Sequence, residues 1–216
     1  MATLPINALF TPLDEKFLLA YGEALMEWSY VENRLFRWFM HLTALEDEMA
    51  RAIFFSARSF LGRSDMLDAV IERATFSNYG QIARQIIEEA TQKANSYAGF
   101  RNAIAHGFVI SEYSEKGRRE FLVQGKHPTH LQSETGITFD RLKIASENFA
   151  SLANLLSWSL RLVGGTDRPD ERLQQLQKCH NKLLLLPNVP DQDKPSQKQL
   201  GRQRQRQAAG RKKSHK

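Results

Sequence analysis

Three residues near the middle of the chain have side chains that can act together on a phosphate group. Arg101, Asn102 and His106 lie in the stretch YAGFRNAIAHGF, residues 97–108. The imidazole of His106 can accept and donate a proton near neutral pH. The guanidinium of Arg101 is permanently charged and can bind two phosphate oxygens at once. Asn102 can donate to a phosphate oxygen or orient the imidazole. The set predicts acid–base chemistry beside a phosphate.

The same positions also have a purely structural interpretation, as the end of a helix. His106 directly precedes Gly107. A histidine in a last helical turn is favoured by the helix dipole and can cap carbonyl groups. Helix capping and a reaction centre therefore both remain open from the residues alone.

The helix that carries these residues is predicted to have two different faces. At about 100° per residue, Tyr97, Phe100 and Ile104 share one side, which we expect to face the core. A second stripe is polar throughout and comprises Glu88, Asn95, Gly99, Asn102 and His106. The glycine in this stripe lets another backbone or a ligand approach closely. Arg101 lies at its edge, and its long side chain can reach it.

Helical spacing of apolar residues predicts most of the remaining elements. The expected helices span residues 14–44, 46–57, 64–74, 77 or 78–106, 138 or 140–163 and 170–186. The first is expected to be a core helix, with Leu18, Leu19 and Met26 among its apolar positions. Ser64 is the expected N-cap of the third helix, and Gly107 the expected end of the fourth. FVISEY and REFLV around SEKG predict a β-hairpin, followed by a loop over residues 124–136.

The composition predicts one domain in a reducing compartment. A chain of 216 residues is long enough for one good core. Its single cysteine, Cys179, excludes an intramolecular disulfide and a cysteine-based metal cage. No segment approaches the run of about 20 apolar residues that a membrane span needs, so we expect no membrane partner and a cytoplasmic location. We read His127 and His130 as loop residues and expect no metal and no cofactor.

The net charge of +6 is concentrated at the C-terminus. Residues 188–216 contain nine Lys or Arg against two Asp, which leaves residues 1–187 slightly acidic. This segment has almost no apolar residues to bury, so we expect residues 1–187 to form the domain and 188–216 a disordered basic tail. Such a tail either binds phosphate backbones without base specificity or only improves solubility.

The motif and its surroundings resemble a known family. RNAIAHG resembles the R-x4-H signature of the HEPN superfamily, the higher eukaryote and prokaryote nucleotide-binding domain, in which a polar residue often follows the arginine. An early helix carrying YVENRLFRWF, a hairpin directly after AHG and another long helix extend the resemblance over about residues 14–163. It implies an all-α HEPN-like helical bundle, here with one hairpin insertion. It also implies a homodimer in which the two motif helices face each other.

The resemblance further implies roles for individual residues. Many relatives are metal-independent endoribonucleases, which would make Arg101, Asn102 and His106 catalytic toward RNA through attack by its 2′-hydroxyl. One chain supplies one motif histidine, so acid and base would come from two chains or from water. Glu32, in YVENRLF, is either an acidic residue that some related domains bring to the motif or a solvated or Arg-paired helix residue.

Two classes of function therefore fit the sequence. The first is a ribonuclease, with a toxin or defence role and with an antitoxin or regulatory protein as its partner, as in some relatives. In some toxin members a tyrosine two residues after the motif histidine is modified by a partner enzyme, and this chain has Phe108 there. The second class is a non-catalytic helical module that binds nucleotide, RNA or a protein partner through the same polar face.

Overall fold

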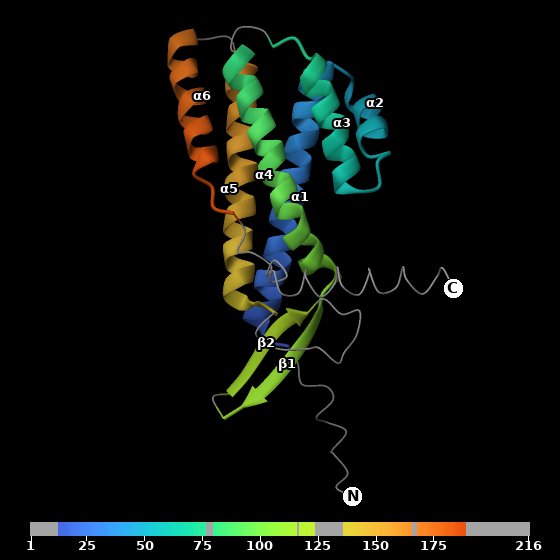
Figure 1. Ribbon diagram of the computed structural model, residues 1–216, viewed down its shortest axis with the longest axis vertical. Helices are drawn as coiled ribbons and strands as arrows, with labels where there is room; N and C mark the ends of the chain where they lie inside the picture. Colours follow the sequence, from blue (N-terminus) through green and yellow to red (C-terminus); the bar gives the residue numbers. More distant parts are fainter. Residues whose placement is uncertain (1–12, 77–79, 116, 124–135, 166–167, 189–216) are drawn as a thin grey trace, which may run out of the picture.

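Two long helices, α1 (Glu15–Thr43) and α5 (Phe139–Val163), form the centre of the fold and run in the same direction (Figure 1). The computed structural model describes residues 13–76, 80–115, 117–123, 136–165 and 168–188. Trp38 of α1 is buried, and its indole nitrogen donates to the Leu156 carbonyl of α5 at 3.1 Å. The described residues are mostly helical, as predicted, while the predicted tail lies outside them except for its first residue.

Four further helices surround this central pair. α4 (Gly80–His106) runs antiparallel to α1 and packs on α1, α3 and α5. α6 (Pro169–Leu184) covers α4 and α5, whereas α2 (Asp47–Phe54) and α3 (Phe60–Arg73) cover α1 at the other side of the bundle (Figure 1). No helix among the described residues combines the length and apolar character that crossing a membrane requires.

A three-stranded antiparallel sheet closes the end of the bundle at which α4 stops. β1 (Phe108–Ser114) pairs with β2 (Gly117–Val123), and β2 pairs with β3 (Ile137–Thr138). This confirms the predicted hairpin, in which Gly117 adopts the positive φ of a tight turn. The strand β3 was not predicted, because two residues are too few to show an alternating pattern.

Close packing explains why a glycine ends α4. A Cβ atom on Gly107 would lie 2.8 Å from the Ala103 carbonyl oxygen and 3.2 Å from the Leu122 Cβ atom of β2. The Ala103 carbonyl of α4 and the adjacent hairpin together leave too little room for a side chain at this position. Glu120 of β2 also accepts hydrogen bonds from the Asp14 backbone nitrogen at 2.9 and 3.0 Å. These contacts hold the sheet against α4 and the N-terminus of α1.

The structure corrects several predicted details. α3 begins at Phe60 with Ser59 as its N-cap, while Ser64, the predicted cap, is buried inside the helix. The second helix ends at Phe54 rather than at residue 57. Leu18, Leu19 and Met26 are exposed on α1, because the core side of that part of the helix is formed by Phe17, Ala20, Ala24 and Trp28, and the three residues point elsewhere. The predicted starts of α4 at residues 77 and 78 and most of the predicted loop 124–136 lie outside the described residues.

Tyr97 of α4 ties the end of the described chain to the core. Its ring is fully buried, and its hydroxyl donates to the Pro187 carbonyl at 2.6 Å. Lys93, one turn earlier, donates to the Leu186 carbonyl at 3.0 Å and to the Asn188 side chain at 3.2 Å. Burial raises the pKa of Tyr97 to about 12.

This raised pKa predicts how the stability of the protein depends on alkaline pH. The unfolded phenol ionises near pH 10, so the stability that Tyr97 contributes is present below pH 10 and is lost as the pH rises toward about 12. We expect Tyr97→Phe to cost about 0.5–1.5 kcal/mol at pH 7, the usual net worth of a hydrogen bond. Urea unfolding should show this deficit shrinking above pH 10. A constant deficit would contradict the assigned role.

Candidate functional site

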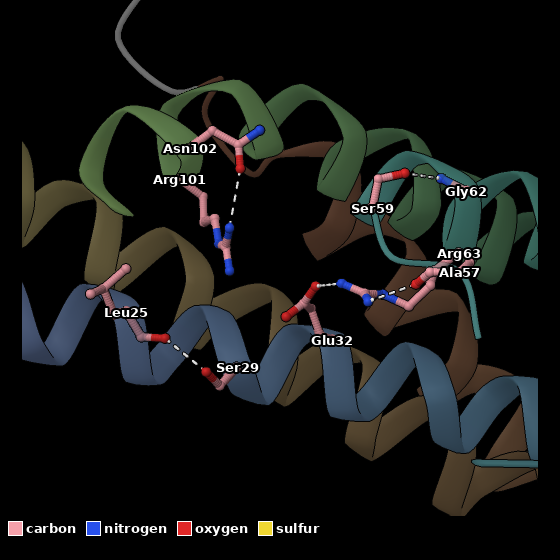
Figure 2. A network of polar contacts seen from close by, with 9 residues as sticks. All are labelled: Leu25, Ser29, Glu32, Ala57, Ser59, Gly62, Arg63, Arg101 and Asn102. Carbon is pink, nitrogen blue, oxygen red and sulfur yellow. Dashed lines mark hydrogen bonds and ion pairs between the residues drawn. The ribbon is translucent and has the colours of Figure 1, made fainter. Parts of the chain in front are cut away.

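The predicted site residues lie where the C-terminal half of α4 passes α1. Figure 2 shows Arg101 and Asn102 on α4 above the segment of α1 that carries Leu25, Ser29 and Glu32. Tyr97, Phe100 and Ile104 are buried, which confirms the predicted core side of α4. That burial fixes the rotation of α4 and leaves Asn102 and His106 on its exposed side.

Arg101 and Asn102 are in direct contact. Nη1 of Arg101 donates a hydrogen bond to the side-chain oxygen Oδ1 of Asn102, with 3.1 Å between the two atoms. Arg101 is half-buried, and its Nε atom is buried without a hydrogen-bond partner in the described residues. Figure 2 shows its guanidinium pointing from α4 toward α1. Asn102 is exposed. The hydrogen bond therefore links the guanidinium of Arg101, which points toward α1, to a side-chain amide at the surface.

His106 is exposed in the last turn of α4. Within the described residues the imidazole forms no hydrogen bond, so it neither caps a helix carbonyl nor is hydrogen-bonded to Arg101 or Asn102. The dipole of α4 still favours a positive charge at this end of the helix. A side chain that can transfer protons is thus held at the surface without a partner of its own.

The predicted polar stripe of α4 is shorter in the structure than in the sequence prediction. Gly99, Asn102 and His106 are exposed, and a Cβ atom on Gly99 would meet nothing within 4 Å. Asn95 instead turns to α3, where its side-chain amide donates to the Ser64 hydroxyl at 2.8 Å. Glu88 pairs with Arg84 at 2.9 Å, one turn away on the same helix. The outward stripe near the motif therefore consists of Gly99, Asn102 and His106.

Glu32 forms an ion pair with an arginine, as one of its two predicted interpretations has it. Its carboxylate accepts from Nη2 of Arg63 on α3 at 2.5 Å, and the two side chains are only 17% and 15% exposed. Arg63 also donates to the Ala57 carbonyl at 3.2 Å. Figure 2 shows the Glu32 carboxylate on the side of α1 toward which Arg101 points. Three helices thus contribute charged side chains to one region.

Sequence reasoning did not identify Arg63 as part of this region. Arg63 and Glu32 are 31 positions apart and belong to different helices. Neither helical periodicity nor a short motif links such positions, since only residues three or four apart meet on one helix. The pair becomes visible only when the packing of α3 on α1 is known.

The described residues contain no group of three or more His, Cys, Asp or Glu side chains placed to hold a metal ion. His127 and His130 lie outside the described residues. Comparisons with protein-family models, with curated proteins and with solved structures found no match to this chain. Functional assignment therefore depends on the geometry of the chain itself.

The low exposure of the Glu32–Arg63 pair predicts a measurable coupling energy. A double-mutant cycle of Glu32→Gln and Arg63→Gln, followed by urea unfolding, should give a coupling of about 1–3 kcal/mol, because each single change leaves a desolvated charge unpaired. The control is Asp47–Arg51, a pair on α2 with side chains 48% and 47% exposed. Its coupling should be about 0.3–0.5 kcal/mol. Equal couplings would show that burial does not strengthen the Glu32 pair.

Proposed function

We propose that this chain is a metal-independent endoribonuclease of the HEPN type, with its reaction centre on the exposed stripe of α4. The proposal rests on one observation: the exposed stripe holds His106, which forms no hydrogen bond within the described residues, together with Asn102, which is hydrogen-bonded to Arg101. An imidazole can transfer protons, and a guanidinium and an amide can bind a phosphate. The R-x4-H spacing supports the same assignment.

The reaction that these groups can perform is transfer of a phosphate to the neighbouring 2′-hydroxyl of RNA. A neutral imidazole takes the 2′-hydroxyl proton as the oxygen attacks phosphorus. The bond to the 5′-oxygen breaks, and an imidazolium gives that oxygen its proton. The products are a 2′,3′-cyclic phosphate and a 5′-hydroxyl. Arg101 would compensate the charge that develops on the phosphorus oxygens.

This reaction needs an acid and a base, whereas the stripe of one chain carries one histidine. A two-fold dimer with facing stripes would supply two His106 and two Arg101 in one site. The open space at Gly99 supports a close approach of the two helices. Exposed apolar residues on the neighbouring helix α1 also favour assembly, namely Leu18, Leu19, Met26 and Tyr30.

One observation favours the non-catalytic alternative. Arg101 is half-buried and points toward α1 (Figure 2), whereas His106 is exposed. An arginine held in this way can serve the packing of α4 on α1 instead of a substrate. In that case the stripe would bind nucleotide, RNA or a protein partner without cleaving anything.

Single substitutions at His106 and Arg101 should show whether these residues act in catalysis or only in structure. We expect the wild-type protein to cleave single-stranded RNA in EDTA, because none of the proposed groups requires a metal. His106→Ala should slow cleavage by about 10²–10⁴-fold, the usual contribution of general acid–base catalysis. Arg101→Ala should lose about 10²–10³-fold by removing charge stabilisation. Gel analysis of labelled RNA measures these rates.

Two matched variants control for general effects on the fold. His41 is an exposed histidine in the last turn of α1, and Arg37 is an exposed arginine on the same helix. His41→Ala and Arg37→Ala should cleave at the wild-type rate. Equal losses in the His106 and His41 variants, or uncut RNA with the wild-type protein, would move the stripe from catalysis to binding.

The dimer that the proposal requires can be tested at Gly99. Gly99→Trp should abolish the dimer in sedimentation velocity without unfolding the chain, because the monomer has open space there. Ser151→Trp, at an exposed position of α5, should leave the dimer intact. Gly99→Ala should raise monomer stability by about 0.5–1 kcal/mol through its higher helix propensity. A wild-type protein that stays monomeric at high concentration would contradict the two-chain site.

A further inference from the structure

A groove lies between α5 and α6 and is lined by residues of both helices. Its volume is about 490 Å³, within the range of sites that hold small ligands. Its walls include Asn154, Trp158 and Arg161 of α5 and Gln175, Lys178 and Lys182 of α6. α6 lies on the side of the bundle away from α2 and α3, so this groove is separate from the Glu32 region (Figure 1).

The groove carries positive charge that no carboxylate of the described residues balances. Arg161, Lys178 and Lys182 are exposed, and none of them forms an ion pair there. No Asp or Glu lines the groove. Lys178 and Lys182 are four residues apart on α6 and so project on the same side of the helix. Three cations facing one concave surface favour an anionic ligand.

An exposed tryptophan accompanies these charges. Trp158 is 48% exposed, whereas Trp28 and Trp38 are 1% and 0% exposed. The Arg161 guanidinium lies 6.0 Å from the centre of the Trp158 ring, a cation–π contact that helps to hold the ring in place. A large aromatic ring kept half in solvent beside cations offers a surface on which a nucleobase can stack.

We propose that this groove binds a short single-stranded segment of nucleic acid. A base would stack on Trp158, phosphates would lie against Lys178, Lys182 and Arg161, and the amides of Asn154 and Gln175 would offer further hydrogen bonds. Each wall spans eight helical residues, 154–161 on α5 and 175–182 on α6. The seven rises between its ends amount to about 10 Å, which is on the order of three stacked nucleotides. A duplex fits less well, because its bases already stack on one another.

An acidic peptide is the competing ligand, since it would also bind three cations. The tryptophan decides between them, because base stacking uses an exposed ring face and a carboxylate does not. The proposal does not depend on RNA cleavage at α4. Binding in the groove and cleavage at the stripe can each be true without the other.

Intrinsic fluorescence gives a readout that is specific to the groove. The full-length protein is titrated with labelled oligodeoxythymidine, which has no 2′-hydroxyl and cannot be cleaved by the proposed reaction. Anisotropy measures affinity, and tryptophan emission measures stacking. We expect saturable quenching in the wild type. Trp158→Phe should keep the affinity within about threefold and lose the quenching, because Trp28 and Trp38 are buried.

Two further variants give quantitative expectations. Trp158→Ala should weaken binding by about 5- to 150-fold, the usual contribution of one stacked base. The double variant Lys178→Gln, Lys182→Gln should lower the slope of log affinity against log salt by about 1.4, the value for two phosphate contacts with a single strand. The controls are Tyr113→Ala at an exposed aromatic residue of β1 and Lys143→Gln at an exposed lysine of α5 outside the groove.

Several results would overturn the proposal. Binding without quenching in the wild type would place the strand elsewhere, for example on the basic segment after residue 188. Equal weakening by Trp158→Ala and Tyr113→Ala would show that Trp158 has no special role. Binding of polyglutamate but not of oligodeoxythymidine would assign the groove to acidic proteins. RNA cleavage rates of the same variants, measured in parallel, show whether a failure belongs to the groove or to α4.

Discussion

The burial of one face of α4 is the constraint on which the rest of the structure depends. Tyr97, Phe100 and Ile104 fill the core between α1, α3, α5 and α6, so α4 cannot rotate without exposing large apolar side chains. Gly99, Asn102 and His106 are exposed for the same reason. The Tyr97 hydroxyl also donates to the Pro187 carbonyl, which holds the last described residues against α4. The packing of α4 thus positions the exposed stripe that the proposed reaction uses.

Arg63 and Arg101 differ in how strongly their charges are paired. Arg63 pairs with Glu32 and donates to the Ala57 carbonyl, and the pair with Glu32 joins α3 to α1. Arg101, in contrast, donates one hydrogen bond, to the exposed side-chain amide of Asn102. Exchanging that bond for contacts with a phosphate costs little, because the amide of Asn102 can return to water. An arginine that can change partners at low cost suits transient charge stabilisation better than one held by a desolvated carboxylate.

Local patterns account for the parts of the fold that the sequence predicts well. The core residues of α4 and the hairpin after Gly107 follow from periodicity and turn chemistry within a few residues. The start of α5 was predicted at residue 138 or 140, and the structure has Thr138 as its N-cap. The misses depend on tertiary contacts. Ser64 is a good N-cap by type, yet packing buries it against Asn95. The Glu32–Arg63 pair and the groove that Trp158 and Lys178 both line bring together residues on different helices, which no short-range pattern links.

The central claim is that the exposed stripe of α4 is a reaction centre. Its most direct test is the chemical identity of the RNA ends that the protein produces. Purified wild-type protein is incubated in EDTA with a short RNA of defined sequence, and the fragments are analysed by mass spectrometry. The account predicts 2′,3′-cyclic phosphates and 5′-hydroxyls, because the neighbouring 2′-hydroxyl is the attacking group. Fragments with 3′-hydroxyls and 5′-phosphates, or RNA that stays intact, would contradict it.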